Sequence, residues 1–308
     1  MPDSPTTLAV TLVPMQEVLN EYGLDFRALA RRAGVDPDLP TRPNARGSVH
    51  RLQKLWQLAS RESGDPLFGL RVGQHARPAV FHALGLGVMS SDTLLAALRR
   101  VERYSRLLST NGRLVVLEDD ECIRLEGRPT EHSIAPSIAT FDAFAVLLCR
   151  LLKLCAGAPG IPRRVLLPHA APPDAAPFVE CLGCPVGFDA PNLVFEFDAR
   201  TARQPVASGN PALAAEADQM AERYLAQIAP ESAAARVRAL LMKAMPSGTI
   251  DQDGIARSLH QSTSTLQRRL RDEGTTYQQL LDQTRRDLAL EYLRAGEHSL
   301  ADITFLLG

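Results

Sequence analysis

Apolar residues in the first part of the chain follow a helical spacing in some segments and form short strand-like runs in others. A spacing of three and four residues predicts amphipathic helices near 15–22, 49–59 and 91–108, where Ser91 or Asp92 can cap the start. A segment that is apolar on nearly all sides predicts a buried helix at 138–155. Short apolar runs predict strands at 114–117, 122–125, 165–167 and 193–197. Together these patterns predict a mixed α/β domain.

The pattern changes near Pro230. From there to the end the chain is almost wholly helical in spacing, with short turns such as Pro-Ser-Gly at 246–248. We therefore expect a domain boundary near 228–232. An N-terminal α/β domain would cover 1–230, and an all-α module would cover 231–308.

The all-α module has the spacing of a helix-turn-helix. Asp251 can cap a first helix whose apolar residues face inward, and His260 and Gln261 form the turn. Ser262 then stands one residue before a second helix at 263–273, and Gly274 follows where a helix ends. The residues expected to form the buried contact are Ile255, Ala256, Leu259, Leu266 and Leu270.

Burial of Leu266 and Leu270 turns the opposite face of helix 263–273 outward. That face carries Ser264, Gln267, Arg268 and Arg271 at helical spacing. Gln pairs with adenine, Arg pairs with guanine, and both hold phosphate oxygens. An ordinary solvated arginine face is the alternative, but the position of the helix behind a capped turn favours DNA reading. The predicted DNA-binding residues are Ser262, Ser264, Gln267, Arg268 and Arg271.

The C-terminal part, residues 249–308, resembles the DNA-binding region of the AraC family of regulators. The resemblance is carried by SLHQSTSTLQRRLRDEGTTYQQLLDQTRRDLALEYL and by SLADITFLLG. It implies a recognition helix at 263–273, a linker helix from Tyr277 to Arg294, and a second helix-turn-helix from Ser299 through Ile303 to Gly308. The N-terminal part resembles the arabinose-binding-type domain of one branch of the family, through ALRRVERYSRLLSTNGRL and LGCPVGFDAPNLVFEFD.

The C-terminal part also departs from the family pattern. Thr263-Ser264 stands where the family often has Pro-Arg, His260 stands where glycine is common, and Thr304 replaces the usual alanine. The chain ends at Gly308, where the second recognition helix should start, so we expect a truncated chain. As given, it is expected to bind DNA weakly or not at all.

Charge and cysteine content bear on how the protein would contact DNA and on its cellular compartment. The net charge is −1, and acidic residues outnumber basic ones after Ser247, so the DNA footprint is expected to be local to one helix. Five scattered cysteines argue against a disulfide framework. No signal peptide or membrane span is recognisable. We expect a cytoplasmic protein.

Other chemistry finds little support. Common catalytic and nucleotide-binding motifs are absent, so no enzyme activity is predicted. Cys181 and Cys184 have metal or redox spacing, but only His169 lies near them in sequence, so neither a metal nor another cofactor is expected. An anionic effector could be held by the basic residues that flank Pro78, which are Arg71, His75, Arg77 and His82. A solvated loop explains these residues better. Trp56 and Phe81 are expected in the core, and helix 138–155 either packs in the core or walls an effector pocket. The effector-binding residues are not predictable.

The favoured hypothesis is a DNA-binding transcription regulator controlled by a small-molecule effector. Its partners would be double-stranded DNA, the effector and a second copy of the chain, with RNA polymerase implied by the family resemblance. The resemblance also favours activation over repression. The alternative is an interaction protein that dimerises with intact regulators without binding DNA itself.

Overall fold

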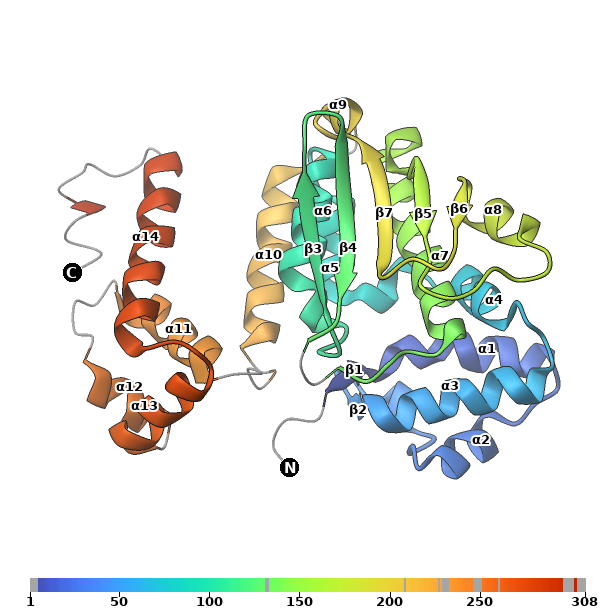
Figure 1. The fold of residues 1–308 in the computed structure, drawn as a ribbon, viewed down its shortest axis with the longest axis horizontal. Helices are drawn as coiled ribbons and strands as arrows, with labels where there is room; N and C mark the ends of the chain where they lie inside the picture. The colour runs from blue at the N-terminus through green and yellow to red at the C-terminus, as the bar shows by residue number, and fades with distance from the viewer. Residues whose placement is uncertain are drawn as a thin grey trace. The chain divides into compact units, whose positions relative to one another are not determined.

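The protein was analysed as a computed structural model, shown in Figure 1. The structure describes residues 5–130, 133–207, 209–226, 228, 233–245, 251–259, 261–295 and 302–303. The chain divides into two compact units, residues 1–225 and 226–308. Most of the boundary region expected from sequence, 228–232, lies outside the described residues.

The N-terminal unit contains a five-stranded sheet in the order β3-β4-β7-β5-β6. Pairing is antiparallel except between β5 and β6, which run parallel. The strands are β3 (Arg113–Glu118), β4 (Cys122–Arg128), β5 (Arg164–Leu166), β6 (Val186–Gly187) and β7 (Leu193–Asp198). A separate two-stranded ribbon pairs β1 (Thr6–Leu8) with β2 (Arg46–Ser48). All four strands expected from sequence are present.

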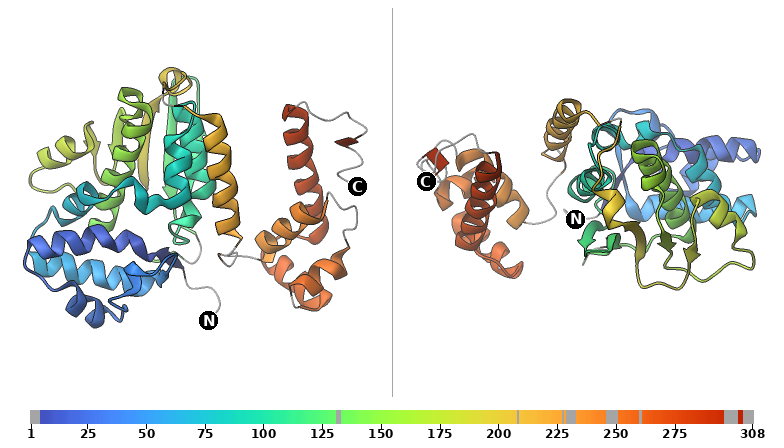
Figure 2. Two further views of the ribbon diagram at one scale, coloured as in Figure 1. Left: turned by 180° about the vertical axis from the view of Figure 1, so that it is seen from behind. Right: turned by 90° about the horizontal axis from the view of Figure 1, so that it is seen from above.

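Helices cover one face of the sheet (Figure 2). The long helix α7 (Ile138–Ala156) is buried along most of its length, as its continuous apolar sequence predicts. Beside it lie α4 (Phe68–His75), α5 (His82–Met89) and α6 (Leu94–Tyr104). The sequence suggested Ser91 or Asp92 as the α6 cap, but Thr93 takes this position, because its Oγ1 accepts from the Ala96 amide at 3.0 Å. Ser91 is buried and donates to the Gly87 carbonyl.

A second layer of helices packs below this core in Figure 1. It comprises α1 (Val13–Glu21), α2 (Phe26–Ala33) and α3 (Val49–Ser63), which share an apolar cluster with Trp56 and Phe68. The Trp56 and Phe68 rings meet edge to face at 6.2 Å. The short helix α8 (Ala176–Leu182) connects β5 to β6, and the short helix α9 (Ala199–Ala202) follows β7 and leads to the last helix of the unit.

Helix α10 (Pro211–Leu225) completes the N-terminal unit and packs on α5 and on the segment after α6. The Arg100 guanidinium makes hydrogen bonds of 3.0 Å to both carboxylate oxygens of Asp218. Arg103 pairs with Glu222 one turn further along, at 2.7 Å. These pairs fix α10 against α6 at the end of the unit from which the chain continues into residues 226–308.

The described residues of the C-terminal unit form helices joined by short turns. Its helices are α11 (Ala233–Ala244), α12 (Gln252–Ser258), α13 (Thr263–Asp272) and α14 (Tyr277–Ala295). They bury a common core that draws apolar residues from all four helices. The observed architecture, a mixed α/β unit followed by a helical one, confirms the fold class expected from sequence.

Candidate DNA-reading helix and effector cavity

Helix α13 is anchored by one apolar face. Leu266 and Leu270 are 0% and 1% exposed, and they pack in the same cluster as Ile255 and Leu259 of the α12 region. Positions four apart lie on the same side of a helix, so burial of this pair turns the opposite side of α13 outward. The expected contact between the two helices is therefore present.

The start and end of α13 are fixed by local hydrogen bonds. Ser262 Oγ accepts from the Thr265 amide at 3.2 Å and also meets the Thr265 and Ser264 hydroxyls. Gly274 follows the helix with φ 71°, which a glycine adopts without strain. The hydroxyl of Ser262 is thus engaged in capping α13. His260, expected in the turn, lies outside the described residues.

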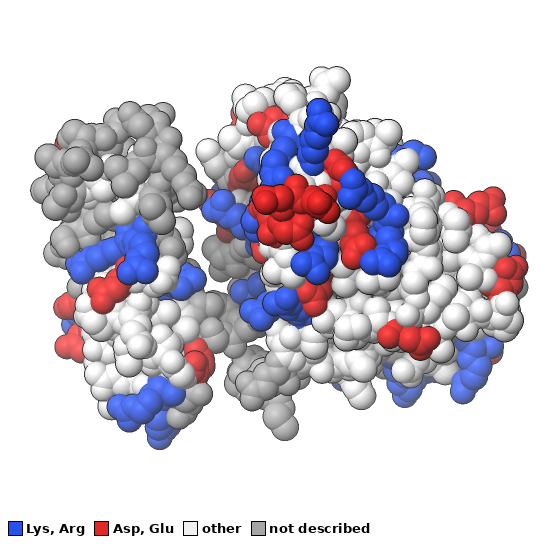
Figure 3. Space-filling view, turned by 45° about the horizontal axis from the view of Figure 1, so that its top comes forward, with Lys and Arg blue, Asp and Glu red and all other residues white. Residues whose placement is uncertain are grey.

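Four of the five predicted DNA-binding residues form the exposed side of α13. Ser264, Gln267, Arg268 and Arg271 are all exposed. Within the described part of the chain, Arg268 and Arg271 take part in none of the ion pairs found, nor does Arg269 beside them. Figure 3 shows basic side chains gathered at the lower end of this unit. Exposed cations with no ion pair to other described residues suit a polyanion.

The turn is braced by side-chain contacts between α12 and α13. Thr263 Oγ1 donates to Asp253 Oδ1 at 2.6 Å, and Gln267 Nε2 donates to Gln252 Oε1 at 3.3 Å. The second bond is long and exposed, so Gln267 can exchange it for another acceptor at little cost. The first bond is short and limits rotation between the two helices.

Helix α14 follows with its own N-terminal cap. The Thr276 hydroxyl accepts from the Gln279 amide at 3.2 Å, while Gln279 Oε1 accepts from the Thr276 amide at 2.9 Å, a reciprocal capping box. The helix spans the expected linker, Tyr277 to Arg294. Of the expected second motif, Ile303 is buried at 5% exposure, whereas Ser299, Thr304 and Gly308 lie outside the described residues.

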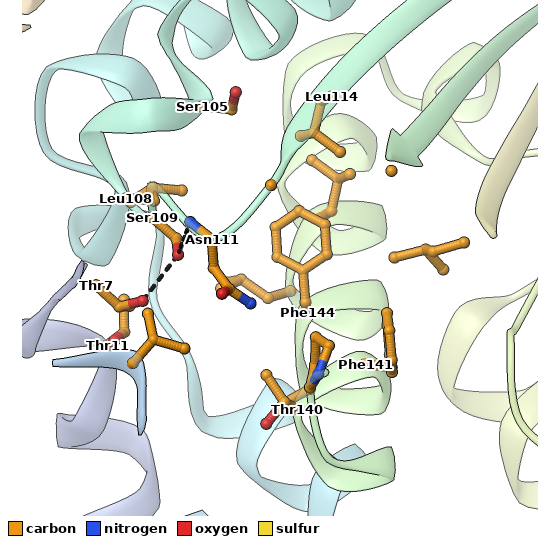
Figure 4. Close-up of a pocket in the computed structure, with 18 of the residues that line it drawn as sticks. Thr7, Thr11, Ser105, Leu108, Ser109, Asn111, Leu114, Thr140, Phe141 and Phe144 are labelled. Carbon is orange, nitrogen blue, oxygen red and sulfur yellow. Dashed lines mark hydrogen bonds between the residues drawn. The ribbon is translucent and has the colours of Figure 1, made fainter. Parts of the chain in front are cut away.

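The N-terminal unit contains a partly open cavity of about 690 Å³. Ligand pockets in proteins typically measure roughly 300–1,000 Å³. The cavity lies between α7, the β1 strand, the hairpin β3–β4 and the segment after α6. Figure 4 shows Phe141 and Phe144 on one side of it and Thr7, Ser109 and Asn111 on the other.

The sequence left open whether helix α7 packs in the core or walls a pocket, and the structure shows both. Most of α7 is buried in the core, and the partly buried Phe141, Phe144 and Leu147 line the cavity. Trp56 and Phe81, expected only in the core, are buried and also line the cavity. Sequence reasoning missed Thr7, Ser109 and Asn111, because they come from separate segments and no local pattern marks them.

The basic residues before Pro78, Arg71, His75 and Arg77, are paired with acidic side chains and are not part of the cavity lining. Arg71 pairs with Asp65 at 2.7 Å, and Arg77 reaches Glu17 at 3.7 Å. His75 Nε2 lies 2.8 Å from Glu21, and the hydrogen bond to the Arg71 carbonyl, together with Glu21, raises the pKa of His75.

His82 packs its ring edge-on against Tyr224, and burial lowers the pKa of His82. With Arg71, His75 and Arg77 already paired, these observations favour a surface loop over an anion site.

Cys181 and Cys184 do not gather metal ligands. Cys181 Sγ accepts from Gln74 Nε2 at 3.0 Å, and burial raises the pKa of the Cys184 thiol to about 11. His169 instead binds Asp142 Oδ1 through Nε2 at 2.9 Å. Across the described residues, no three His, Cys, Asp or Glu side chains come together as a metal site would need.

Comparison with known proteins agrees with this architecture. Residues 23–206 match the family of the N-terminal arabinose-binding domain of AraC transcription regulators. The ornithine utilization regulator of Pseudomonas aeruginosa is 31% identical over 311 residues, covering 99% of this chain and 91% of that protein. The chain belongs to the AraC family of transcription regulators. The family expected from sequence is thereby confirmed.

Other relatives are also regulators. The AraC-family chain is 27% identical to the HTH-type transcriptional regulator VirS of Mycobacterium tuberculosis over 305 residues, which cover 97% of this chain and 88% of VirS. A crystal structure of the transcriptional regulator CdpR from P. aeruginosa aligns with 96% of this chain and 90% of its own, at 21% identity and a TM-score of 0.48. Within the described residues, no helix is long and apolar enough to span a membrane.

Proposed function

We propose that this AraC-family protein binds a specific double-stranded DNA sequence through α13 and that a small molecule in the N-terminal cavity controls this binding. The observation that carries the proposal is the exposed side of α13. A capped helix held by Leu266 and Leu270 presents amide and guanidinium groups that have no ion-pair partner among the described residues.

The side chains on α13 take different roles. Gln267 and Arg268 lie near the middle of the exposed side and read base edges in the major groove, Gln267 pairing with adenine and Arg268 with guanine. Arg271 lies one turn after them and holds a phosphate or a base, and the short Ser264 reaches a backbone phosphate. Ser262 acts mainly by fixing the start of the helix.

Effector control requires a connection between the cavity and the C-terminal unit. Phe81 and Leu84 line the cavity from the region of α5, and Val101 lines it from α6. Helix α10 packs against α5, and Arg100 of α6 binds Asp218 of α10. A ligand that shifts α5 or α6 therefore moves α10, from which the chain leads into residues 226–308.

The proposal also implies partners and a location. An AraC-family regulator would act as a homodimer, contact RNA polymerase as an activator, and work in the cytoplasm where the chromosome lies. These roles rest on family membership. Two copies of α13 would then read two half-sites separated by whole turns of DNA.

The direct test is selection of duplexes from a random pool by the full-length protein as its gene encodes it. Wild type is expected to enrich one sequence motif. Gln267→Ala is expected to relax the preference at one base pair, because the bidentate contact to that base is lost. Gln278→Ala, an exposed glutamine on α14, is the matched control and should select the wild-type motif.

Failure to enrich any motif at low salt would contradict the proposal. It would favour the second candidate, a protein that acts by pairing with intact regulators. Co-purification with a DNA-binding relative, without DNA binding of its own, would then be the expected observation.

A further inference from the structure

The lining of the cavity in the N-terminal unit consists mostly of uncharged residues. Among the described residues that line it, none is Asp, Glu, Lys or His. Two arginines, Arg113 and Arg128, also belong to the lining. They stand directly opposite each other in the β3–β4 hairpin.

Strand alternation places the two arginine side chains on the face of the hairpin opposite to Leu114 and Gly127. Successive residues of a strand face opposite sides of the sheet. Leu114 and Gly127 are the next pair along the hairpin, and their side of the sheet carries the buried core residues Val116 and Leu125. The alternation therefore turns Arg113 and Arg128 to the outer side, where Arg128 pairs with Glu126 at 2.8 Å.

Uncharged polar groups gather on one wall of the cavity, formed by Thr7, Thr11, Ser109 and Asn111 (Figure 4). The Thr7 and Ser109 hydroxyls lie 2.8 Å apart, and Ser109 Oγ accepts from the Asn111 amide at 3.2 Å. The hydroxyl pair has two hydrogens and its mutual bond uses one, so the other remains available to a ligand. Thr11 donates to the Leu8 carbonyl at 2.6 Å and keeps acceptor lone pairs.

The wall itself is held rigidly. The side-chain Nδ2 of Asn111 donates to the Ile134 carbonyl at 2.7 Å, and its Oδ1 accepts from the Ile134 backbone amide at 2.8 Å. Both ends of the Asn111 side-chain amide are therefore already hydrogen-bonded. Behind Thr7, the Arg46 guanidinium bonds the Thr6 hydroxyl at 2.9 Å and the Leu107 carbonyl at 2.6 Å. The wall therefore offers a ligand one hydroxyl donor and a few acceptors in fixed positions.

The opposite wall, on α7, is mainly apolar and incompletely covered, and the Thr140 hydroxyl on this side donates to Gln53 Oε1 at 3.1 Å. Phe141, Phe144 and Leu147 recur along the cavity side of α7, and all three are only partly buried, whereas Val146 and Leu148 beside them are fully buried. Covering apolar surface of this kind with a ligand removes it from water, which favours binding. A hydrocarbon body fits this side of the cavity.

We infer that the cavity takes an uncharged, mainly hydrocarbon effector whose single hydroxyl or carbonyl group lies against Thr7, Thr11 and Ser109. The inference rests on the proposed function and specifies the class of effector. A charged amino acid is disfavoured, because burying an ionised group without a partner is strongly unfavourable. The ornithine utilization named for one relative therefore does not carry over to this cavity.

Three probes that share one chain and differ only in head group test the inference: 1-decanol, decanoate and decylamine. Trp56 is the only tryptophan and lines the cavity, so its fluorescence reports binding without DNA. Decanol is expected to bind saturably and at least about tenfold more tightly than either charged probe, with no response to ornithine. Equal or tighter binding of a charged probe would overturn the inference, as would failure of all three to bind.

A pair of threonine variants locates the head group. Thr7→Val keeps the shape but removes the hydroxyl, and it should weaken decanol binding by about 2- to 10-fold. Thr41→Val, an exposed threonine outside the cavity, should bind as wild type does. An unchanged affinity in Thr7→Val would overturn the assignment of the polar wall.

DNA binding is measured separately, with and without saturating decanol. If decanol binds the cavity but leaves DNA affinity unchanged, effector control fails while the inferred ligand class stands. If DNA affinity responds to decanoate but not to decanol, the ligand class fails while effector control stands.

Discussion

His169 and Asp142 form a buried pair beside the cavity. Their side chains are 9% and 1% exposed, and His169 Nδ1 also faces the Ala170 carbonyl at 3.0 Å. Burial acts against the charged ring, but the hydrogen bonds to Asp142 and Ala170 outweigh it and raise the pKa of His169. For Asp142, burial raises the pKa of the carboxyl group, although the hydrogen bond and the charge of His169 act to lower it. Both ring nitrogens face acceptors, so the pair retains a proton that the unfolded chain releases.

This pair predicts a pH dependence of stability. Above pH 6.5, the usual histidine value, unfolded His169 loses its proton while the native pair keeps it. The native state then binds more protons, so the free energy of unfolding falls as pH rises from 6.5 through the raised native pKa. The fall amounts to about 1.4 kcal/mol for each unit by which the native pKa exceeds 6.5.

The measurement is urea unfolding followed by Trp56 fluorescence between pH 6 and pH 8. His169→Gln is expected to flatten the decline, whereas His50→Gln, at an exposed histidine, should leave it as in wild type. A slope that is the same in His169→Gln and wild type would show that the pair does not hold the proton.

Residues whose role depends on local sequence could be predicted, and residues joined by the fold could not. Ser262 and Asp251 were predicted as caps because a cap acts within three residues, and both are engaged as caps. His169 and Asp142 are separated by 27 positions, and nothing near either residue marks the other. Ser264, Gln267, Arg268 and Arg271 lie where the sequence predicted, but their contact with DNA remains a prediction.

Among the helices, α4 and α7 approach each other unusually closely. A Cβ added to Gly69 would lie 2.5 Å from the Ala139 carbonyl, and one added to Gly73 would lie 2.7 Å from the Ala143 carbonyl. The two glycines are four residues apart and so lie on the same face of α4. Their missing side chains allow α4 to pack against the backbone of α7, which walls the cavity.

Gly69→Ala is expected to lower the free energy of unfolding of the N-terminal unit by about 1–3 kcal/mol, because a carbonyl of α7 cannot move aside without shifting the helix. Gly127→Ala is the control, since its added Cβ would meet neighbours at 3.7 Å or more. Urea unfolding reported by Trp56 compares the two variants. Equal stability of both would mean that the close approach does not constrain the packing.

Elements with strong apolar periodicity were predicted well, and short or mixed ones were missed. The buried helix α7 and four of the five strands of the sheet have apolar patterns that can be recognised in the sequence, whereas the two-residue strand β6 was not predicted. Helix α5, with Gly85 and Gly87, has little helical preference of its own, and its packing against α6 and α10 supplies the stability. The ribbon β1–β2 joins segments about forty residues apart, which no local pattern reveals.

In the whole molecule, positive and negative charges nearly balance, and the arginines expected to meet DNA lie on one helix, α13. The net charge of −1 gives no general attraction for DNA. Arginines of the N-terminal unit are largely paired, as with Arg99, Arg100 and Arg164, while the described residues offer no ion pair to Arg268 and Arg271 on α13. The affinity for DNA is therefore expected to come from α13 in each copy of the chain and to depend moderately on salt concentration.

The most direct measurement compares two neighbouring arginines of α13 in the full-length protein. Fluorescence anisotropy gives the affinity of wild type, Arg268→Ala and Arg269→Ala for the selected duplex across salt concentrations. Arg269 is also exposed, but it lies about 200° around the helix from Gln267 and so on another side of α13. Both substitutions remove the same charge, so any difference between them reflects position.

Arg268→Ala is expected to cost about 1–3 kcal/mol and to relax the sequence preference, whereas Arg269→Ala should cost less and keep the preference. An equal loss in both variants would mean that α13 contributes only charge. No loss in either would contradict the account that this helix reads DNA.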